Sequence, residues 1–159
     1  MKKSFIYILI FLNLSFLFAD SYITINNQSI SLDTSIKEIQ GLFGIQKELD
    51  IIPFEQNPNW DTFCYKYADF TVYSSRITKL PFKIEIFSEN QSLTVNDKKI
   101  VIGTSKKSVE SIIGKISFDG MDNNNPIYVY YLLDNKEVGF VFDENDNLKL
   151  AYLSYTPMD

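Results

Sequence analysis

The chain contains no histidine, a single cysteine and only six glycines in 159 residues. Without histidine, the commonest general base and metal ligand is missing, which excludes Ser/His/Asp and Cys/His catalytic sites. The single cysteine, Cys64, cannot form a disulfide within the chain, and its strand-like setting predicts a buried small hydrophobe. The glycines are scattered, and the closest pair, Gly41 and Gly44, ends a predicted helix, so there is no phosphate-binding loop. These absences favour a binding protein over an enzyme.

Positive charge is also scarce, with 15 Lys and Arg against 20 Asp and Glu and a formal net charge of −5. An acidic chain has no electrostatic basis for binding nucleic acid or an anionic membrane. The acidity would suit a basic protein partner, or it simply keeps the protein in solution.

The N-terminus has the pattern of an export signal. A basic start at Lys2 and Lys3 precedes an apolar run from Phe5 to Phe18, and Leu17-Phe18-Ala19 fits a signal-peptidase site. The run is short for a membrane span, which needs roughly 20 residues. An uncleaved anchor is the alternative. We predict a signal peptide at residues 1–19 and a periplasmic or secreted protein without stable membrane insertion after cleavage.

The remaining chain contains an internal repeat at a spacing of 70 residues. Residues 22–44 align with residues 92–114 without a gap, and seven of the 23 aligned positions are identical. The identical positions in the first copy are Thr24, Asn26, Ile30, Thr34, Ser35, Lys37 and Gly44. Repetition at this spacing predicts two copies of one small structural unit. We place the first unit at residues 20–90 and the second at residues 91–159.

Each unit is predicted to be an α+β repeat. A short hairpin turns at Asn26-Asn27 or Asn96-Asp97, and a helix follows whose apolar residues lie three and four apart. Ser35-Ile36-Lys37-Glu38 fits a capping box at the start of the first helix. Gly44 and Gly114 stand where a helix end favours a positive φ. A polar loop, such as residues 119–126 in the second unit, then leads into a three-stranded antiparallel meander.

The last predicted strand of the second unit is apolar on both faces. We expect Leu148, Leu150 and Tyr152 to point inward, with Lys149, Ala151 and Leu153 on the other side. A half-buried sheet normally shows one polar face. Two arrangements fit this pattern: the sheets of the two units pack on each other, which we prefer, or one face is free for a partner.

Aromatic residues are abundant, with 10 Tyr, 13 Phe and one Trp. Tyrosine and tryptophan combine apolar area with a polar tip and are enriched at interfaces, although a core tyrosine whose hydroxyl reaches the surface is the alternative for each. The candidate partner-binding residues are Trp60, Tyr65, Tyr67, Tyr73, Tyr128 and Tyr130.

Two acidic segments, Asp119–Asp122 and Asp143–Asp146, are the remaining candidates for catalysis. Both lie in Asn-rich predicted turns. The segment beginning at Asp143 matches a calcium loop at three positions, but Leu148 replaces its glycine and Ser154 its bidentate glutamate. A β-turn is therefore the preferred interpretation, and we predict neither a metal nor a cofactor.

The order of elements resembles the repeat unit of the β-lactamase inhibitory protein family and of the related small outer-membrane assembly lipoproteins. In the second unit Thr104, Val109, Gly114, Tyr128/Tyr130, Phe140/Phe142 and Asp143–Asn147 fill the positions of that pattern. In the first unit the matching residues are Thr34, Ile39, Gly44, Tyr65/Tyr67 and Phe70/Val72. The resemblance implies two units whose sheets form a concave, aromatic-lined surface that grips a protein target. The chain departs from the family in having no cysteine pair and only one clear helix per unit.

These observations together predict an exported, non-enzymatic protein-binding module that acts through a Tyr-rich sheet face. An inhibitor, an immunity protein and an envelope accessory are forms it could take. Two alternatives stay open: a periplasmic carrier of a small apolar ligand, and a carboxylate-based hydrolase at the two acidic segments.

Overall fold

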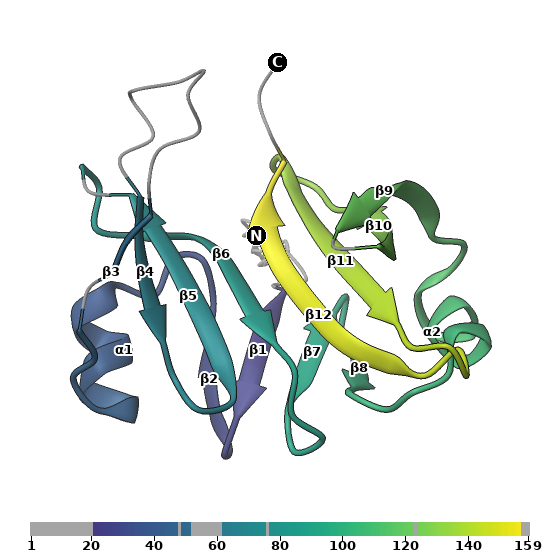
Figure 1. Cartoon of the computed structure of the whole chain (residues 1–159), viewed down its shortest axis with the longest axis horizontal. Helices are drawn as coiled ribbons and strands as arrows, with labels where there is room; N and C mark the ends of the chain where they lie inside the picture. The colour runs from purple at the N-terminus through teal and green to yellow at the C-terminus, as the bar shows by residue number, and fades with distance from the viewer. Residues whose placement is uncertain (1–20, 48, 52–61, 76, 123, 157–159) are drawn as a thin grey trace, which may run out of the picture.

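A computed structural model describes residues 21–47, 49–51, 62–75, 77–122 and 124–156. The predicted signal peptide and Trp60 lie outside these residues. Within these residues the fold is an α+β arrangement of two antiparallel sheets with two short helices (Figure 1). None of the described helices is long and apolar enough to span a membrane.

The elements follow the same order in the two halves of the chain. The first half contains β1 (Tyr22–Ile25), β2 (Gln28–Ile30), α1 (Ile36–Phe43), β3 (Leu49–Ile51), β4 (Thr62–Lys66), β5 (Phe70–Ser75) and β6 (Pro81–Ile86). The second half contains β7 (Ser92–Val95), β8 (Lys98–Val101), α2 (Lys106–Ile113), β9 (Ser117–Asp122), β10 (Asn125–Tyr131), β11 (Lys136–Phe142) and β12 (Leu148–Tyr155).

The local signals in the sequence have the predicted outcomes. Both residues of the β1–β2 turn, Asn26 and Asn27, have positive φ, as tight hairpin turns require. Ser35 and Glu38 form the predicted capping box at the start of α1. Gly44 and Gly114 end the two helices with φ of 91° and 101°, a backbone conformation that favours glycine.

The hairpins of the two halves pair to form a four-stranded sheet in the order β2-β1-β7-β8. At its centre β1 and β7 run antiparallel, with Ile23 opposite Leu93. Both side chains have 0% exposure, so the contact between the halves lies within the core.

The remaining strands form one eight-stranded sheet in the order β3-β4-β5-β6-β12-β11-β10-β9. Its two halves meet where β6 pairs with β12, with Ile84 opposite Leu153. The preferred prediction, in which two separate sheets pack face to face, is therefore wrong. The meanders join edge to edge, because this pairing satisfies backbone groups that two separate sheets would leave free at their edges.

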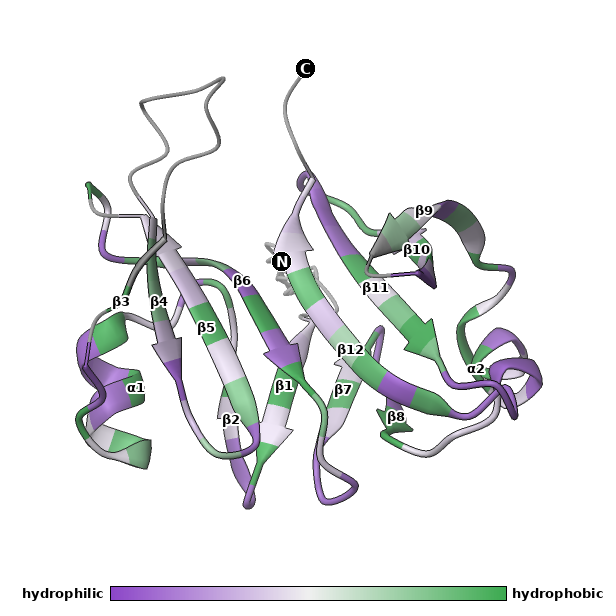
Figure 2. Ribbon diagram, viewed as in Figure 1, coloured by the Kyte–Doolittle hydropathy of each residue, from purple (hydrophilic) through white to green (hydrophobic). Residues whose placement is uncertain are grey.

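Both helices and the four-stranded sheet lie on one face of the eight-stranded sheet, which we call the covered face (Figure 1). Hydropathy alternates along β5, β6 and β12, as expected for strands with one face on the core (Figure 2). Core residues that the eight-stranded sheet contributes are Tyr65, Phe70, Val72, Ile84, Ile86, Val138, Phe140, Phe142, Leu148, Ala151 and Leu153. The alternate positions of the same strands form the opposite face, which we call the outer face.

Two expectations for the second half are wrong. The expected loop at residues 119–126 instead holds the end of β9 and the start of β10, because pairing with β10 overrides the weak strand propensity of Asp and Gly. Each three-stranded meander is therefore extended by a further strand, β3 or β9.

The second wrong expectation concerns the faces of β12. Ala151 and Leu153 face the core in place of Leu150 and Tyr152, because a register shift opposite Val141 and Phe142 changes the alternation.

Leu93→Ala is expected to lower the free energy of unfolding by roughly 2–5 kcal/mol, because it leaves a cavity at the β1–β7 contact. Val101→Ala on β8, where the side chain is partly exposed, should cost less than about 1 kcal/mol. Denaturant unfolding followed by circular dichroism measures both. Because each sheet contains strands from both halves, we expect one cooperative transition. Two separate transitions would show that the halves fold independently.

Candidate functional site

The structure separates the predicted tyrosines onto the two faces of the eight-stranded sheet. Tyr65 is 1% exposed and belongs to the core, so it is not available to a partner. Tyr67, Tyr128 and Tyr130 are partly buried and pack against the core from the covered face. Only Tyr73 lies on the outer face, because the preceding residue, Val72, belongs to the core. The five predicted tyrosines therefore do not form one surface.

On the covered face, Tyr67 belongs to an aromatic cluster under α1. Its ring stacks on that of Phe70 with centroids 4.2 Å apart, and Phe43 of α1 meets the Phe70 ring edge-on at 5.0 Å. Burial raises the pKa of the Tyr67 hydroxyl, which makes no hydrogen bond within the described residues. These contacts give Tyr67 a packing role.

Tyr128 has a similar role next to α2. The Nζ atom of Lys106, the first residue of α2, lies 3.5 Å from the centroid of the Tyr128 ring. Phe118 and Phe142 meet the same ring edge-on. Helix α2 therefore closes over this part of the covered face.

The outer face carries a cluster of polar and aromatic side chains where the two halves meet. Its members come from four neighbouring strands, β5, β6, β12 and β11. We call them the outer-face cluster: Tyr73, Lys83, Glu85, Glu137, Tyr152 and Ser154.

Strand pairing places these residues in two rows across the sheet. In the first row Tyr131 of β10 pairs with Glu137, Glu137 with Ser154, Ser154 with Lys83, and Lys83 with Tyr73. In the second row Gly139 pairs with Tyr152, and Tyr152 with Glu85. Directly opposed residues on one face of an antiparallel sheet are about 5 Å apart, so each row is a continuous line of contacts.

Lys83 is the cation of the cluster, and its charge is balanced locally. Its Nζ atom lies 2.7 Å from Oε1 of Glu85 and 4.3 Å from the centroid of the Tyr152 ring. The hydroxyl of Tyr73 donates a hydrogen bond of 3.0 Å to Oε2 of Glu85. Glu85 therefore has a partner at both oxygens.

Glu137 is buried, with 7% of the residue exposed. Its Oε1 atom accepts hydrogen bonds from Ser154 Oγ at 3.2 Å and from the Tyr152 hydroxyl at 3.4 Å. Burial is the main cause that raises the pKa of this carboxyl; the bond from Ser154 opposes it, and the negative charge of Asp119 adds to it. Among the described residues, no cation lies within ion-pair distance of Glu137. A buried glutamate is almost always paired in proteins, which makes this one unusual.

Tyr152 covers Gly139 at the centre of the cluster. A Cβ atom added to Gly139 would lie only 1.9 Å from Cζ of Tyr152, so the ring rests directly on the glycine backbone. Burial and the negative charge of Glu137 both raise the pKa of the Tyr152 hydroxyl. The hydroxyl therefore remains protonated and able to donate to Glu137.

Sequence reasoning missed the second-half members of this cluster. A glycine inside an apolar strand often marks a close approach by another group, and Gly139 was such a signal in β11. Glu137 gave no signal, because it follows the polar residues 134–136 at the start of the strand. The partners of β11 could not be read from the sequence, because they depend on the pairing of β12 with β6.

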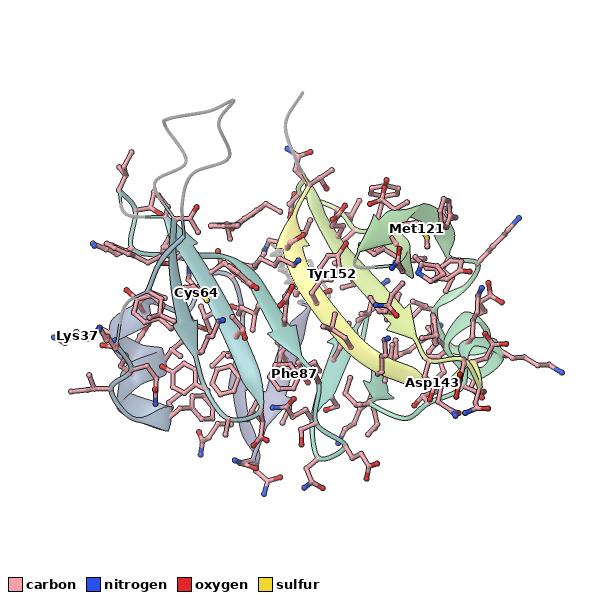
Figure 3. The ribbon with its side chains drawn as sticks, in the orientation of Figure 1. Lys37, Cys64, Phe87, Met121, Asp143 and Tyr152 are labelled. Carbon is pink, nitrogen blue, oxygen red and sulfur yellow. The ribbon has the colours of Figure 1, made fainter. Side chains whose placement is uncertain are left out.

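The two acidic segments have different settings. The Oδ1 atom of Asp143 accepts hydrogen bonds from the backbone N–H groups of Asn145 at 2.9 Å and Asn147 at 2.8 Å, which lower the pKa of its carboxyl. The predicted turn is thus confirmed, and Figure 3 shows Asp143 well away from Tyr152. Asp119 instead acts electrostatically on Glu137 and Tyr152. Within the part of the chain that the structure describes, no three metal-ligating side chains come together.

Comparison with known proteins gives a fold relationship alone. No protein-family model matches the chain, and no curated protein sequence matches it. The structure is similar to that of a DUF4309 family protein, YjgB, from Bacillus subtilis, with a TM-score of 0.50 and 12% sequence identity. The match covers 80% of this chain and 84% of that one. At this identity the two proteins share a fold, and nothing about the activity of either follows.

Gly139→Ala is expected to destabilise the protein by roughly 1–3 kcal/mol, because the new methyl group must displace the Tyr152 ring. Gly41→Ala in α1 is the matched control. Its methyl group meets nothing within 4 Å, so higher helix propensity should stabilise the protein by about 0.5–1 kcal/mol. Denaturant unfolding measures both free energies. A destabilising Gly41→Ala together with a neutral Gly139→Ala would contradict the described packing.

Glu137→Gln is expected to raise the melting temperature near pH 8 and to have little effect near pH 4. The folded-state pKa of Glu137 lies above its value in the unfolded chain, so the wild-type protein loses stability as the pH rises through this window. Glutamine keeps an acceptor for Tyr152 and Ser154 but does not ionise. Thermal unfolding at both pH values gives the comparison, with Glu144→Gln in an exposed turn as control. An equal effect at both pH values would contradict this ionisation cost.

Proposed function

We propose that the protein is an exported, non-enzymatic protein-binding module that binds its partner through the outer face. The observation that carries the proposal is the outer-face cluster itself. The core uses the covered face, so the cluster does not belong to the packing of the helices on the sheet. Aromatic rings beside partly buried charged groups are typical of the centre of a protein interface.

We further propose that the two halves are tandem copies of one unit. The common order of elements supports this, as does the pairing of Ile23 with Leu93, which are equivalent residues in the sequence alignment. The cluster then lies at the junction of the copies. The first copy supplies Lys83 and Glu85, and the second supplies Glu137 and Tyr152, so neither unit alone would hold the site.

Export and a basic partner complete the proposal. The N-terminal sequence supports cleavage after Ala19 and a periplasmic or secreted location. Removing Lys2 and Lys3 takes the formal net charge from −5 to −7, which would speed the approach of a basic partner. Engagement through a sheet face is also what the resemblance to the β-lactamase inhibitory protein family implies.

The test is capture of a partner by immobilised residues 20–159 from the envelope fraction of the source cell, with two adjacent tyrosines as a matched pair. Tyr131 is 57% exposed and lies on the outer face, whereas Tyr130 packs against the core from the covered face. We expect Tyr131→Ala to weaken capture about tenfold or more, because exposed aromatic residues dominate interface energies, and Tyr130→Ala to retain it.

Circular dichroism and thermal unfolding establish that both variants are folded. Loss of the partner in Tyr130→Ala with retention in Tyr131→Ala would move the interface to the covered face. A lipid or another apolar molecule that co-purifies, without a protein partner, would favour the carrier alternative.

A further inference from the structure

Glu137 is a buried carboxylate without an ion-pair partner among the described residues, although the more distant charge of Lys83 acts on it and lowers its pKa. Both of its hydrogen bonds come from neutral hydroxyl groups and end on Oε1. Its Oε2 atom accepts no hydrogen bond within the part of the chain that the structure describes. Lys83, the cation nearest to it in the cluster, forms its ion pair with Glu85. A buried charge without a partner is costly, so an external cation at this position would stabilise the protein.

The surroundings of Glu137 suit a positively charged group. Asp119 adds a second negative charge close enough to act on Glu137. Across the strand pair lies the exposed ring of Tyr131, and the hydroxyl of Tyr152 holds the carboxylate in place. Carboxylates beside aromatic rings bind guanidinium and ammonium groups through charge-assisted hydrogen bonds and cation–π contacts.

The neighbouring strand already holds a cation in this way. Lys83 lies between the Glu85 carboxylate and the rings of Tyr152 and Tyr73, with its Nζ atom 4.3 and 5.7 Å from the two centroids. The position of Glu137 has the same composition, a carboxylate with tyrosines on either side, but none of the described residues places a cation within ion-pair distance of it. The outer face therefore carries one carboxylate that is paired with its own lysine and a second that no described cation pairs with.

We propose that Glu137 anchors an arginine side chain of the protein partner. This inference rests on the proposed function and adds the chemistry that the partner must present. Arginine fits better than lysine, because a planar guanidinium can donate to Oε2 of Glu137 while its face lies against the Tyr131 ring. The partner's arginine would supply the ion pair that Glu137 does not form with any described residue.

Binding at this position requires the ionised form of Glu137. The charged and titratable groups that face it are Lys83 on β6, Asp119 on β9 and Tyr152 on β12, with Glu85 behind Lys83. Affinity for the cation should therefore fall as the pH is lowered and Glu137 takes up a proton.

The direct test uses the amide of acetyl-arginine as a probe and acetyl-citrulline amide as its neutral isostere. Residues 20–159, which contain every described element, are titrated while backbone amide signals are followed by NMR. We expect saturable shifts at Glu137, Tyr131 and Ser154 with the arginine probe. Glu137→Gln should weaken them roughly tenfold or more, the effect of losing a hydrogen bond to a charged group, whereas Glu144→Gln should not.

Three outcomes would overturn the inference: no saturable shift at these residues, an equal response to the citrulline probe, or unchanged affinity in Glu137→Gln. Since glutamine preserves the shape of the side chain and its acceptor, loss of probe binding in a folded variant reports on charge. Weaker binding at pH 5 than at pH 8 in the wild-type protein, absent in Glu137→Gln, would support it further.

Capture of the partner separates this inference from the proposed function. If Tyr131→Ala abolishes capture and Glu137→Gln does not, the outer face is the interface but Glu137 is not its anchor. If the arginine probe binds and no protein is captured, a protein is not the source of the cation, and the proposed function fails together with this inference. Loss of capture in both variants, with Glu144→Gln unaffected, is the result we expect.

Discussion

The antiparallel pairing of β6 with β12 is the contact on which the rest of the structure depends. It joins four strands from each half into one eight-stranded sheet, with Ile84 and Leu153 opposed at the centre. Together with the β1–β7 pairing it gives the halves a common core, so neither half buries its apolar residues alone. A free edge on either strand would expose unpaired backbone groups and invite association with other chains. The same pairing brings Lys83 and Glu85 beside Tyr152 and Ser154.

The outer-face cluster shows how unequally charge is balanced in this sheet. Glu85 is paired with a lysine and a tyrosine hydroxyl, whereas Glu137 accepts from two hydroxyls and forms no ion pair within the described part of the chain. The low polarity around a buried carboxylate strengthens every interaction it makes and raises the cost of leaving it unpaired. A group of this kind therefore lowers the stability of the folded protein. It lies on the face that the core does not use, and this position is the basis of the proposed binding role.

The aromatic residues show why composition was a poor guide to the site. Tyr65, Tyr67, Tyr128 and Tyr130 have the amphipathic character expected of interface residues, yet all four pack against the core. Because side chains alternate along β10, Tyr130 and Tyr131 lie on opposite faces of the sheet. The sequence does not show which of these faces is covered by the helices. Tyr152 was expected in the core, and the register shift in β12 places it on the outer face instead.

The sequence by itself determined the features that depend on neighbouring residues. Asn26 and Asn27 form a hairpin turn because their side chains tolerate positive φ, Ser35 and Glu38 cap a helix, and Gly44 ends it, all within a few residues. Only the tertiary structure decided which strands meet and which face they bury. The pairing of β6 with β12 joins residues about 70 positions apart, and a single extra residue in a strand moves every later side chain to the other face. The candidate site is made of such long-range pairs, which is why local patterns identified the elements but not the cluster.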